Sequence, residues 1–94
     1  MKSKNIYVIC ALRVADIWGQ PIPPENQYWE YLGRDNTGHY TLDSRRFAIE
    51  FSSVEEAEKN WNPNQMSDLC RYDPESICIC EEVAKYFICK SLTT

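Results

Sequence analysis

The chain has 94 residues, of which 44% are hydrophobic and 13% aromatic. That is enough for one small core, and it excludes an intrinsically disordered chain. The formal net charge of −4 argues against a nucleic-acid binder, which needs a basic stripe to displace counterions from phosphate. No apolar run approaches the roughly 20 residues of a membrane span, and Arg13 and Asp16 interrupt the first apolar segment where a signal peptide would continue. We therefore expect one compact domain, residues 1–94, in the cytoplasm.

The first predicted element is a strand over residues 5–14. Apolar residues occupy both faces of its two-residue repeat, which is typical of a central strand. Residues 15–27 contain three prolines, which lack a backbone donor, so this segment is predicted to be a loop. The loop also carries Ile17, Trp18 and Ile22. Two interpretations of these side chains stay open: they fold back over the core, or they form a contact surface.

A β-hairpin is predicted next, with arms at residues 28–34 and 39–43. The residues between the arms, 35–38, fit a type I turn with Asp first and Gly fourth, where φ must be positive. In this register Leu32 lies across from Leu42 and Arg34 across from Tyr40, and the opposite face holds Trp29, Tyr31, His39 and Thr41. Either face could belong to the core.

The clearest predicted helix spans residues 52–62. Ser52 and Glu55 fit a capping box at its start, and Pro63 ends it. Its apolar stripe is formed by Val54, Ala57 and Trp61.

Two flanking segments complete the predicted fold. Residues 43–51 are predicted as one turn followed by an extended stretch in which Phe47, Ile49 and Phe51 point inward. Residues 76–92 favour strand over helix because they are rich in β-branched and aromatic residues, and they form one long strand or two short ones. We therefore predict an α+β fold: a small antiparallel sheet of about four strands with one short amphipathic helix packed on one face.

The sequence offers little catalytic or metal-binding chemistry. Five cysteines, an odd number, suit reduced thiols. None forms the C-x₂₋₄-C pair typical of structural zinc, so a set of Cys70, Cys78, Cys80 and His39 is a weak candidate, and buried thiols that behave as small apolar side chains are expected. No nucleophile motif or phosphate-binding loop is present. We predict no enzyme activity, no cofactor and no metal.

Residues 28–61 combine an aromatic hairpin with a phenylalanine and a capped acidic helix, FSSVEEAEKNW. This third of the chain resembles small α/β proteins encoded by bacteriophages and other mobile elements, a class that includes anti-CRISPR inhibitors. The resemblance implies a compact accessory protein without enzymatic machinery. Such a protein acts in the host bacterial cytosol by occupying a surface of a larger host protein, such as a nucleic-acid-binding defence effector. No site residue is carried over by motif.

The resulting hypothesis is a protein-binding module that inhibits its target stoichiometrically by covering a surface. Trp18 and Ile22 would anchor the contact. A basic groove of the partner would meet the carboxylates of Glu55, Glu56, Glu58, Glu81 and Glu82. Neither a membrane nor a small-molecule substrate is expected, and an exposed strand edge leaves a homodimer open.

Two alternatives stay open. The first is a nucleic-acid-binding regulator that would use the hairpin aromatics Trp29, Tyr31 and Tyr40 with the arginines Arg34, Arg45 and Arg46. The second is a metal or redox protein centred on the five cysteines, Cys10, Cys70, Cys78, Cys80 and Cys89.

Overall fold

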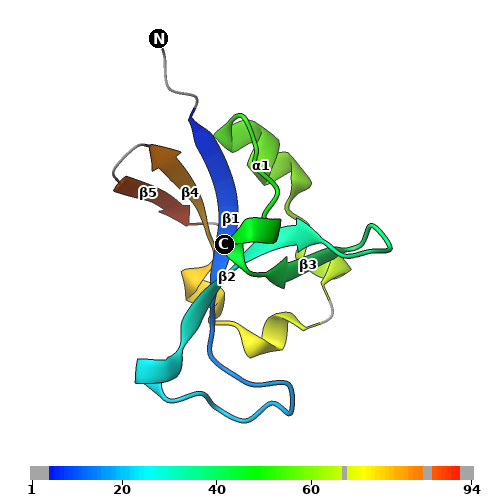
Figure 1. Ribbon diagram of the computed structural model, residues 1–94, viewed down its shortest axis with the longest axis vertical. Helices are drawn as coiled ribbons and strands as arrows, with labels where there is room; N and C mark the ends of the chain where they lie inside the picture. Colours follow the sequence, from blue (N-terminus) through cyan, green and yellow to red (C-terminus); the bar gives the residue numbers. More distant parts are fainter. Residues whose placement is uncertain (1–4, 67, 84–85, 92–94) are drawn as a thin grey trace.

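A computed structural model describes residues 5–66, 68–83 and 86–91, with the stretch from residue 83 onward described by its backbone alone (Figure 1). Its main element is a five-stranded antiparallel sheet in the order β3-β2-β1-β4-β5. The strands are β1 (Ile6–Arg13), β2 (Tyr28–Arg34), β3 (Tyr40–Asp43), β4 (Cys78–Val83) and β5 (Tyr86–Ser91). One α-helix is described, α1 (Val54–Asn60), and it packs against β1 and β4. Among the described residues, no helix is both long and apolar enough to cross a membrane.

The predicted fold class is confirmed, because the molecule is α+β with an antiparallel sheet and one helix on a sheet face. The first predicted strand is central, as expected from its two apolar faces. The segment predicted over 76–92 is extended and forms two short strands, β4 and β5, which raises the described sheet from about four strands to five. Leu92 lies outside the described residues.

The core has two parts, one on each side of the sheet. The larger part lies between the sheet and α1, and its buried members include Ile9, Leu32, Phe51, Ala57 and Ile79. The smaller part lies on the other face and consists of Val8, Cys10, Cys78 and Cys80, with Ile6, Tyr31 and Ala48 packed around it. The Leu32–Leu42 side of the hairpin is therefore the side that faces the main core.

The hairpin forms in the predicted register, with Leu32 opposite Leu42 and Arg34 opposite Tyr40. Gly38 has a φ of +87°, which glycine adopts without steric cost, and its N–H donates to the Asp35 carbonyl at 3.0 Å. The turn chemistry of residues 35–38 therefore sets which hairpin side chains share a face.

Two local predictions are corrected by the structure. The helix is capped by Ser53 rather than Ser52: the Ser53 hydroxyl accepts from the Glu56 N–H at 3.1 Å, and the Glu56 carboxylate accepts from the backbone N–H and hydroxyl of Ser52. Phe47 does not point inward like Phe51. It ends a 3₁₀ turn, Arg45–Phe47, which breaks the strand alternation and leaves the Phe47 ring exposed.

Candidate functional site

The loop between β1 and β2 begins with a tightly hydrogen-bonded turn, residues 16–20, at the lower end of the molecule in Figure 1. The Asp16 carboxylate accepts from the backbone N–H groups of Trp18 and Gln20, both at 2.9 Å. The Asp16 N–H donates to the Gln20 carbonyl at 2.9 Å, and Gly19 closes the turn with a φ of +80°. An aspartate that caps its own turn in this way is a local device that fixes the backbone.

The base of this loop is fastened to the rest of the fold. The Ile22 N–H donates to the Val14 carbonyl at 2.8 Å, and Ala15 forms a β-bridge with Pro21. Arg71, in the 3₁₀ turn Leu69–Arg71, accepts at its carbonyl from the N–H of Val14 and donates from its guanidinium to the Ile17 carbonyl at 3.1 Å. The loop is therefore held from within and from a segment distant in sequence.

This fixed loop presents two large apolar side chains to solvent. Trp18 is 78% exposed and Ile17 is 60% exposed, while Ile22 is half-buried. The sequence left two interpretations open for these side chains. The half-buried Ile22 fits the first, in which the side chain folds back towards the core, whereas Ile17 and Trp18 face outward and fit the second. We call Ile17 and Trp18 with the turn that carries them, residues 14–22, the Trp18 loop.

A buried polar network lies next to the base of the Trp18 loop. Arg13 is buried at the end of β1 and pairs with Glu30 at 3.1 Å, and the Tyr72 hydroxyl donates to the same Glu30 carboxylate at 2.6 Å. Arg13 also donates to the Ala15 carbonyl at 2.7 Å. Burial, and next the hydrogen bond to Glu30, raise the pKa of the Tyr72 phenol far above its usual range. The network joins β1, β2 and the Tyr72 segment directly behind the loop.

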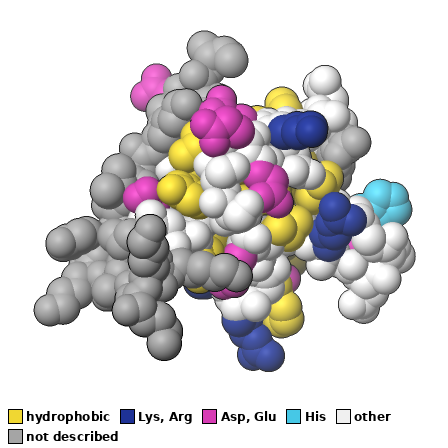
Figure 2. All heavy atoms as spheres, turned by 90° about the horizontal axis from the view of Figure 1, so that it is seen from above, with side chains coloured by type: hydrophobic (Ala, Val, Ile, Leu, Met, Phe, Trp, Pro, Cys, Tyr) yellow, Lys and Arg dark blue, Asp and Glu magenta, His cyan; other side chains and the backbone are white. Residues whose placement is uncertain are grey.

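The five predicted partner-binding carboxylates lie elsewhere. Glu55, Glu56 and Glu58 are exposed on α1, and Glu56 is engaged in the helix cap. Glu81 and Glu82 are neighbours on β4 and point to opposite faces: Glu81 accepts from the Tyr7 hydroxyl at 3.1 Å, and Glu82 is ion-paired with Arg45. Figure 2 looks onto the α1 end of the molecule and shows acidic side chains scattered there rather than gathered in one patch.

The acidic residues and the Trp18 loop lie at opposite ends of β1. Glu81 pairs with Tyr7 near the start of this strand, and Tyr7 also bonds through its backbone to Phe51, just before the helix. The Trp18 loop follows Arg13, the last residue of the strand. The structure therefore does not bring the predicted apolar anchors and the predicted carboxylates into one continuous cluster.

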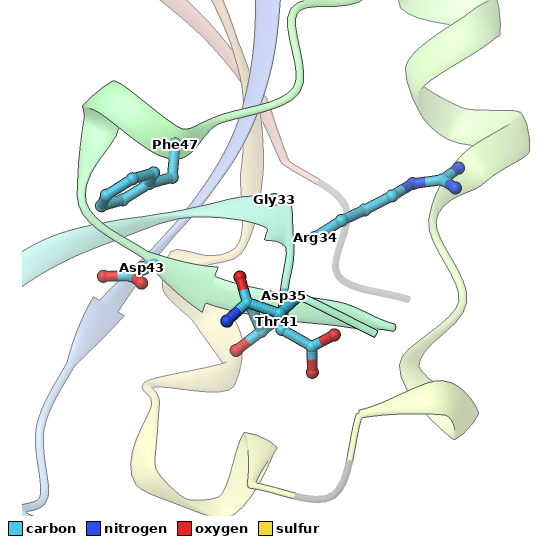
Figure 3. Close-up of a pocket in the computed structure, with 7 residues that line it drawn as sticks. Gly33, Arg34, Asp35, Thr41, Asp43 and Phe47 are labelled. Carbon is cyan, nitrogen blue, oxygen red and sulfur yellow. The ribbon is translucent and has the colours of Figure 1, made fainter. Parts of the chain in front are cut away.

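A hollow of about 320 Å³ lies on the outer side of the hairpin and is lined by Gly33, Arg34, Asp35, Asn36, Thr41, Asp43 and Phe47. Figure 3 shows the Phe47 ring at one end, with Asp43, Thr41 and Asp35 along the hairpin, while the Arg34 side chain extends away from them. The Asp35 carboxylate already accepts from the N–H groups of Thr37 and His39 in the turn. The side chains that line the hollow are polar except for Phe47, and they include one hydroxyl, on Thr41, and two carboxylates, on Asp35 and Asp43.

The residues proposed for nucleic-acid stacking are divided between the two faces of the sheet. Trp29 and Tyr31 lie on one face, and Tyr40 lies on the other, where its hydroxyl donates to Asn60 of α1 at 3.2 Å. Arg45 is ion-paired with Glu50 and Glu82. The structure therefore does not assemble these side chains into a single basic and aromatic platform.

The cysteines come together in a way that their sequence spacing did not reveal. Among the described residues, the sulfur atoms of Cys10, Cys78 and Cys80 lie within 4.8 Å of one another and are buried. Cys70 is exposed and His39 lies at the hairpin turn, so the ligand set considered from sequence is not the one that converges. The convergence depends on the pairing of β1 with β4. The available sequence signal was the two-residue spacing of Cys78 and Cys80, which puts both side chains on one face of a strand. That spacing does not identify the strand that carries the third cysteine.

No protein-family model, curated protein or solved structure matches this chain. The resemblance to mobile-element proteins therefore stays a hypothesis, and the surface of the molecule is what supports a function.

Proposed function

We propose that this chain is a non-enzymatic protein-binding module whose anchor is the Trp18 loop. The observation that carries the proposal is that Trp18, the most exposed large apolar side chain described, stands on a backbone fixed by hydrogen bonds. Tryptophan is enriched among residues that dominate binding energy at protein interfaces. An exposed tryptophan on a rigid turn is suited to insert into a pocket of a partner.

The rigidity of the loop matters for affinity. Ordering a flexible loop on binding costs free energy, and a loop already fixed in its bound shape avoids that cost. Here the Asp16 carboxylate and the Arg71 guanidinium hold the turn before any partner arrives. The apolar surface of Ile17 and Trp18 can then be buried without a folding step.

The exposed carboxylates of α1 serve a second role in this proposal. They are too far from the Trp18 loop to form one compact anchor with it, but a field of negative charge accelerates the approach of a basic partner. We assign Glu55 and Glu58 to this steering role. Such a partner is a larger host protein with a basic, nucleic-acid-binding surface in the bacterial cytosol.

The mode of action that fits these features is occlusion, as in the mobile-element inhibitors that the hairpin and helix resemble. One copy of the chain would cover a surface of a defence effector, such as a CRISPR-Cas protein, and inhibit it stoichiometrically. The proposal does not require a pocket, a cofactor or a metal.

The experiment compares three immobilised proteins: wild type, Trp18→Ala and Phe47→Ala. Phe47 is a matched control because it is also a large exposed aromatic residue, on a different part of the surface. A host protein retained by wild type and by Phe47→Ala, and lost with Trp18→Ala, is purified and titrated by calorimetry. We expect a stoichiometry of one to one and a loss of at least about 2 kcal/mol, roughly 30-fold in Kd, for Trp18→Ala.

Circular dichroism and thermal unfolding of the Trp18→Ala chain should match those of wild type, since the side chain is outside the core. Equal retention of every host protein by wild type and Trp18→Ala would contradict the proposal. Retention of nucleic acid alone, with a steep decrease in salt, would favour the nucleic-acid alternative instead.

A further inference from the structure

Three buried thiols converge on the sheet face opposite α1. Cys10 lies on β1 directly across from Cys78 of β4, and Cys80 is two residues further along the same strand, so all three side chains point to one side. The Sγ–Sγ distances are 2.8 Å for Cys10–Cys80, 3.4 Å for Cys10–Cys78 and 3.6 Å for Cys78–Cys80. We infer that Cys10, Cys78 and Cys80 form a binding site for a thiophilic metal ion, and that the ion is zinc.

The spacing of the sulfur atoms agrees with this ion. A tetrahedral zinc site has Zn–S bonds of about 2.3 Å, which places its sulfur atoms about 3.8 Å apart. The three observed separations lie within about 1 Å of that value. The shortest, 2.8 Å, is still well beyond the roughly 2.05 Å of a disulfide bond.

The directly opposed pair, Cys10 and Cys78, is a poor setting for a disulfide bond. Directly opposed residues of an antiparallel pair, such as Cys10 and Cys78, commonly have Cβ atoms about 4.5–5.5 Å apart, whereas a disulfide prefers about 3.8 Å. A disulfide would also use only two of the three sulfur atoms. A metal ion uses all three and requires little movement of the backbone.

The chemistry of the donor set selects the class of metal. Thiolates are soft ligands that favour zinc, copper(I) and iron–sulfur clusters over magnesium or calcium. Zinc has no geometric preference of its own and accepts a site imposed by a rigid sheet. Binding releases the thiol protons, so that thiolates coordinate the ion.

The surroundings are those of a protected structural site. Val8 is fully buried beside the sulfur atoms, and Ile6, Tyr31 and Ala48 pack around them. These apolar and aromatic neighbours shield the three sulfur atoms from solvent.

Structural zinc usually has four protein ligands, and the described thiols supply three. The backbone pairing of β4 with β5 sets Cys89 directly across from Cys80. The side chain of Cys89 lies outside the described residues, so the inferred site rests on the other three cysteines. The register nevertheless makes Cys89 the residue to test as the fourth ligand.

The test measures metal in the full chain purified under reducing conditions from zinc-supplemented medium. We expect about one zinc per chain by elemental analysis. Replacing zinc with cobalt(II) should give the thiolate charge-transfer absorption and the intense visible bands of a tetrahedral sulfur site. Removing the metal with a chelator should lower the Tm of the wild-type chain.

The chain offers a matched set of serine variants. Cys70→Ser, at an exposed cysteine outside the cluster, should keep the zinc, the cobalt spectrum and the chelator-dependent fall in Tm. Cys10→Ser should lose all three, and its Tm should no longer respond to chelator. If Cys10→Ser does not fold, the wild-type zinc content and cobalt spectrum still decide the matter.

Cys89→Ser distinguishes two forms of the same site. Weaker zinc binding with an altered cobalt spectrum would establish four thiolates, and an unchanged spectrum would establish three thiolates with a different fourth ligand. The inference is overturned if the wild-type chain contains no thiophilic metal and gives no tetrahedral cobalt spectrum. It is equally overturned if the cluster is isolated as a disulfide under reducing conditions.

Discussion

Arg13 is a buried cation whose interactions connect three segments of the chain. Its partner Glu30 lies on the neighbouring strand, while Tyr72 is 59 residues away in sequence. Removing one partner of a buried pair commonly costs about 3–5 kcal/mol because the remaining charge is left uncompensated. The two-residue repeat of a strand puts the side chains of Arg13 and Ile9 on the same face of β1. No local sequence pattern, however, could identify Tyr72 as a neighbour of Arg13.

We predict that Tyr72→Phe lowers the free energy of unfolding by about 1–2 kcal/mol near neutral pH, because the hydrogen bond to Glu30 is lost. The variant should also change the alkaline limb of the stability profile. The pKa of Tyr72 is raised in the folded state, so its stabilising effect is complete below the ordinary tyrosine pKa of about 10 and is lost as the pH rises above that value.

Urea unfolding at intervals from pH 7 to pH 11 checks this prediction. The stability of the wild-type chain should fall above about pH 10 more steeply than that of Tyr72→Phe. Some slope should remain in the variant, since the pKa values of Tyr7 and Tyr31 are also raised. Parallel profiles for the two proteins would show that Tyr72 ionises in the folded state as it does in the unfolded chain.

At the scale of elements, the start of α1 distinguishes two adjacent serines. Ser53 caps the helix through the Glu56 N–H, whereas the Ser52 side chain bonds to the exposed Glu56 carboxylate. We predict that Ser53→Ala costs about 1 kcal/mol of stability and that Ser52→Ala costs clearly less. Denaturant unfolding of both variants measures the difference. A larger cost for Ser52→Ala would restore the cap position expected from the sequence.

Elements were predictable where local chemistry decides the conformation. The Asp and Gly of the 35–38 turn fix the hairpin register, and the alternation in β1 indicates a buried strand. Phe47 was misplaced because it was assigned to the extended stretch that follows the predicted turn, whereas the 3₁₀ turn, Arg45–Phe47, includes it. The cap was shifted by one residue because Ser52 and Ser53 both precede a glutamate at the right spacing, and only the three-dimensional entry of the chain separates them.

At the scale of the whole molecule, the sequence could suggest candidate site residues but not their grouping. The loop prolines with Trp18 indicated a structured surface segment, and the structure keeps Trp18 exposed there. The convergence of Cys10 with Cys78 and Cys80, 68 and 70 residues apart in sequence, follows from the pairing of β1 with β4. The same topology puts the α1 carboxylates and the Trp18 loop at opposite ends of the central strand (Figure 1). Long-range strand order therefore determines which candidates can act together.

The distance between the α1 carboxylates and the Trp18 loop can be tested with the double variant Glu55→Lys/Glu58→Lys. The eight residues of β1, at about 3.3 Å each, put roughly 25 Å between the end of β1 that lies near α1 and the end that leads into the Trp18 loop. Charges are screened over about 8 Å in 0.15 M salt but over about 30 Å in 0.01 M salt. Steering by the helix carboxylates should therefore lower the association rate of the variant with a basic partner in low salt, and the loss should nearly vanish in 0.15 M salt. The dissociation rate should stay the same, because the anchor at Trp18 is untouched.

Surface plasmon resonance at the two salt concentrations measures both rates, and Glu55→Gln/Glu58→Gln should give a smaller loss of association rate because it neutralises the charges without reversing them. Glu56 is left in place because it belongs to the helix cap. A faster dissociation of either variant in 0.15 M salt would contradict the steering role. It would mean that the partner contacts both ends of β1, so that the carboxylates and Trp18 belong to one extended interface.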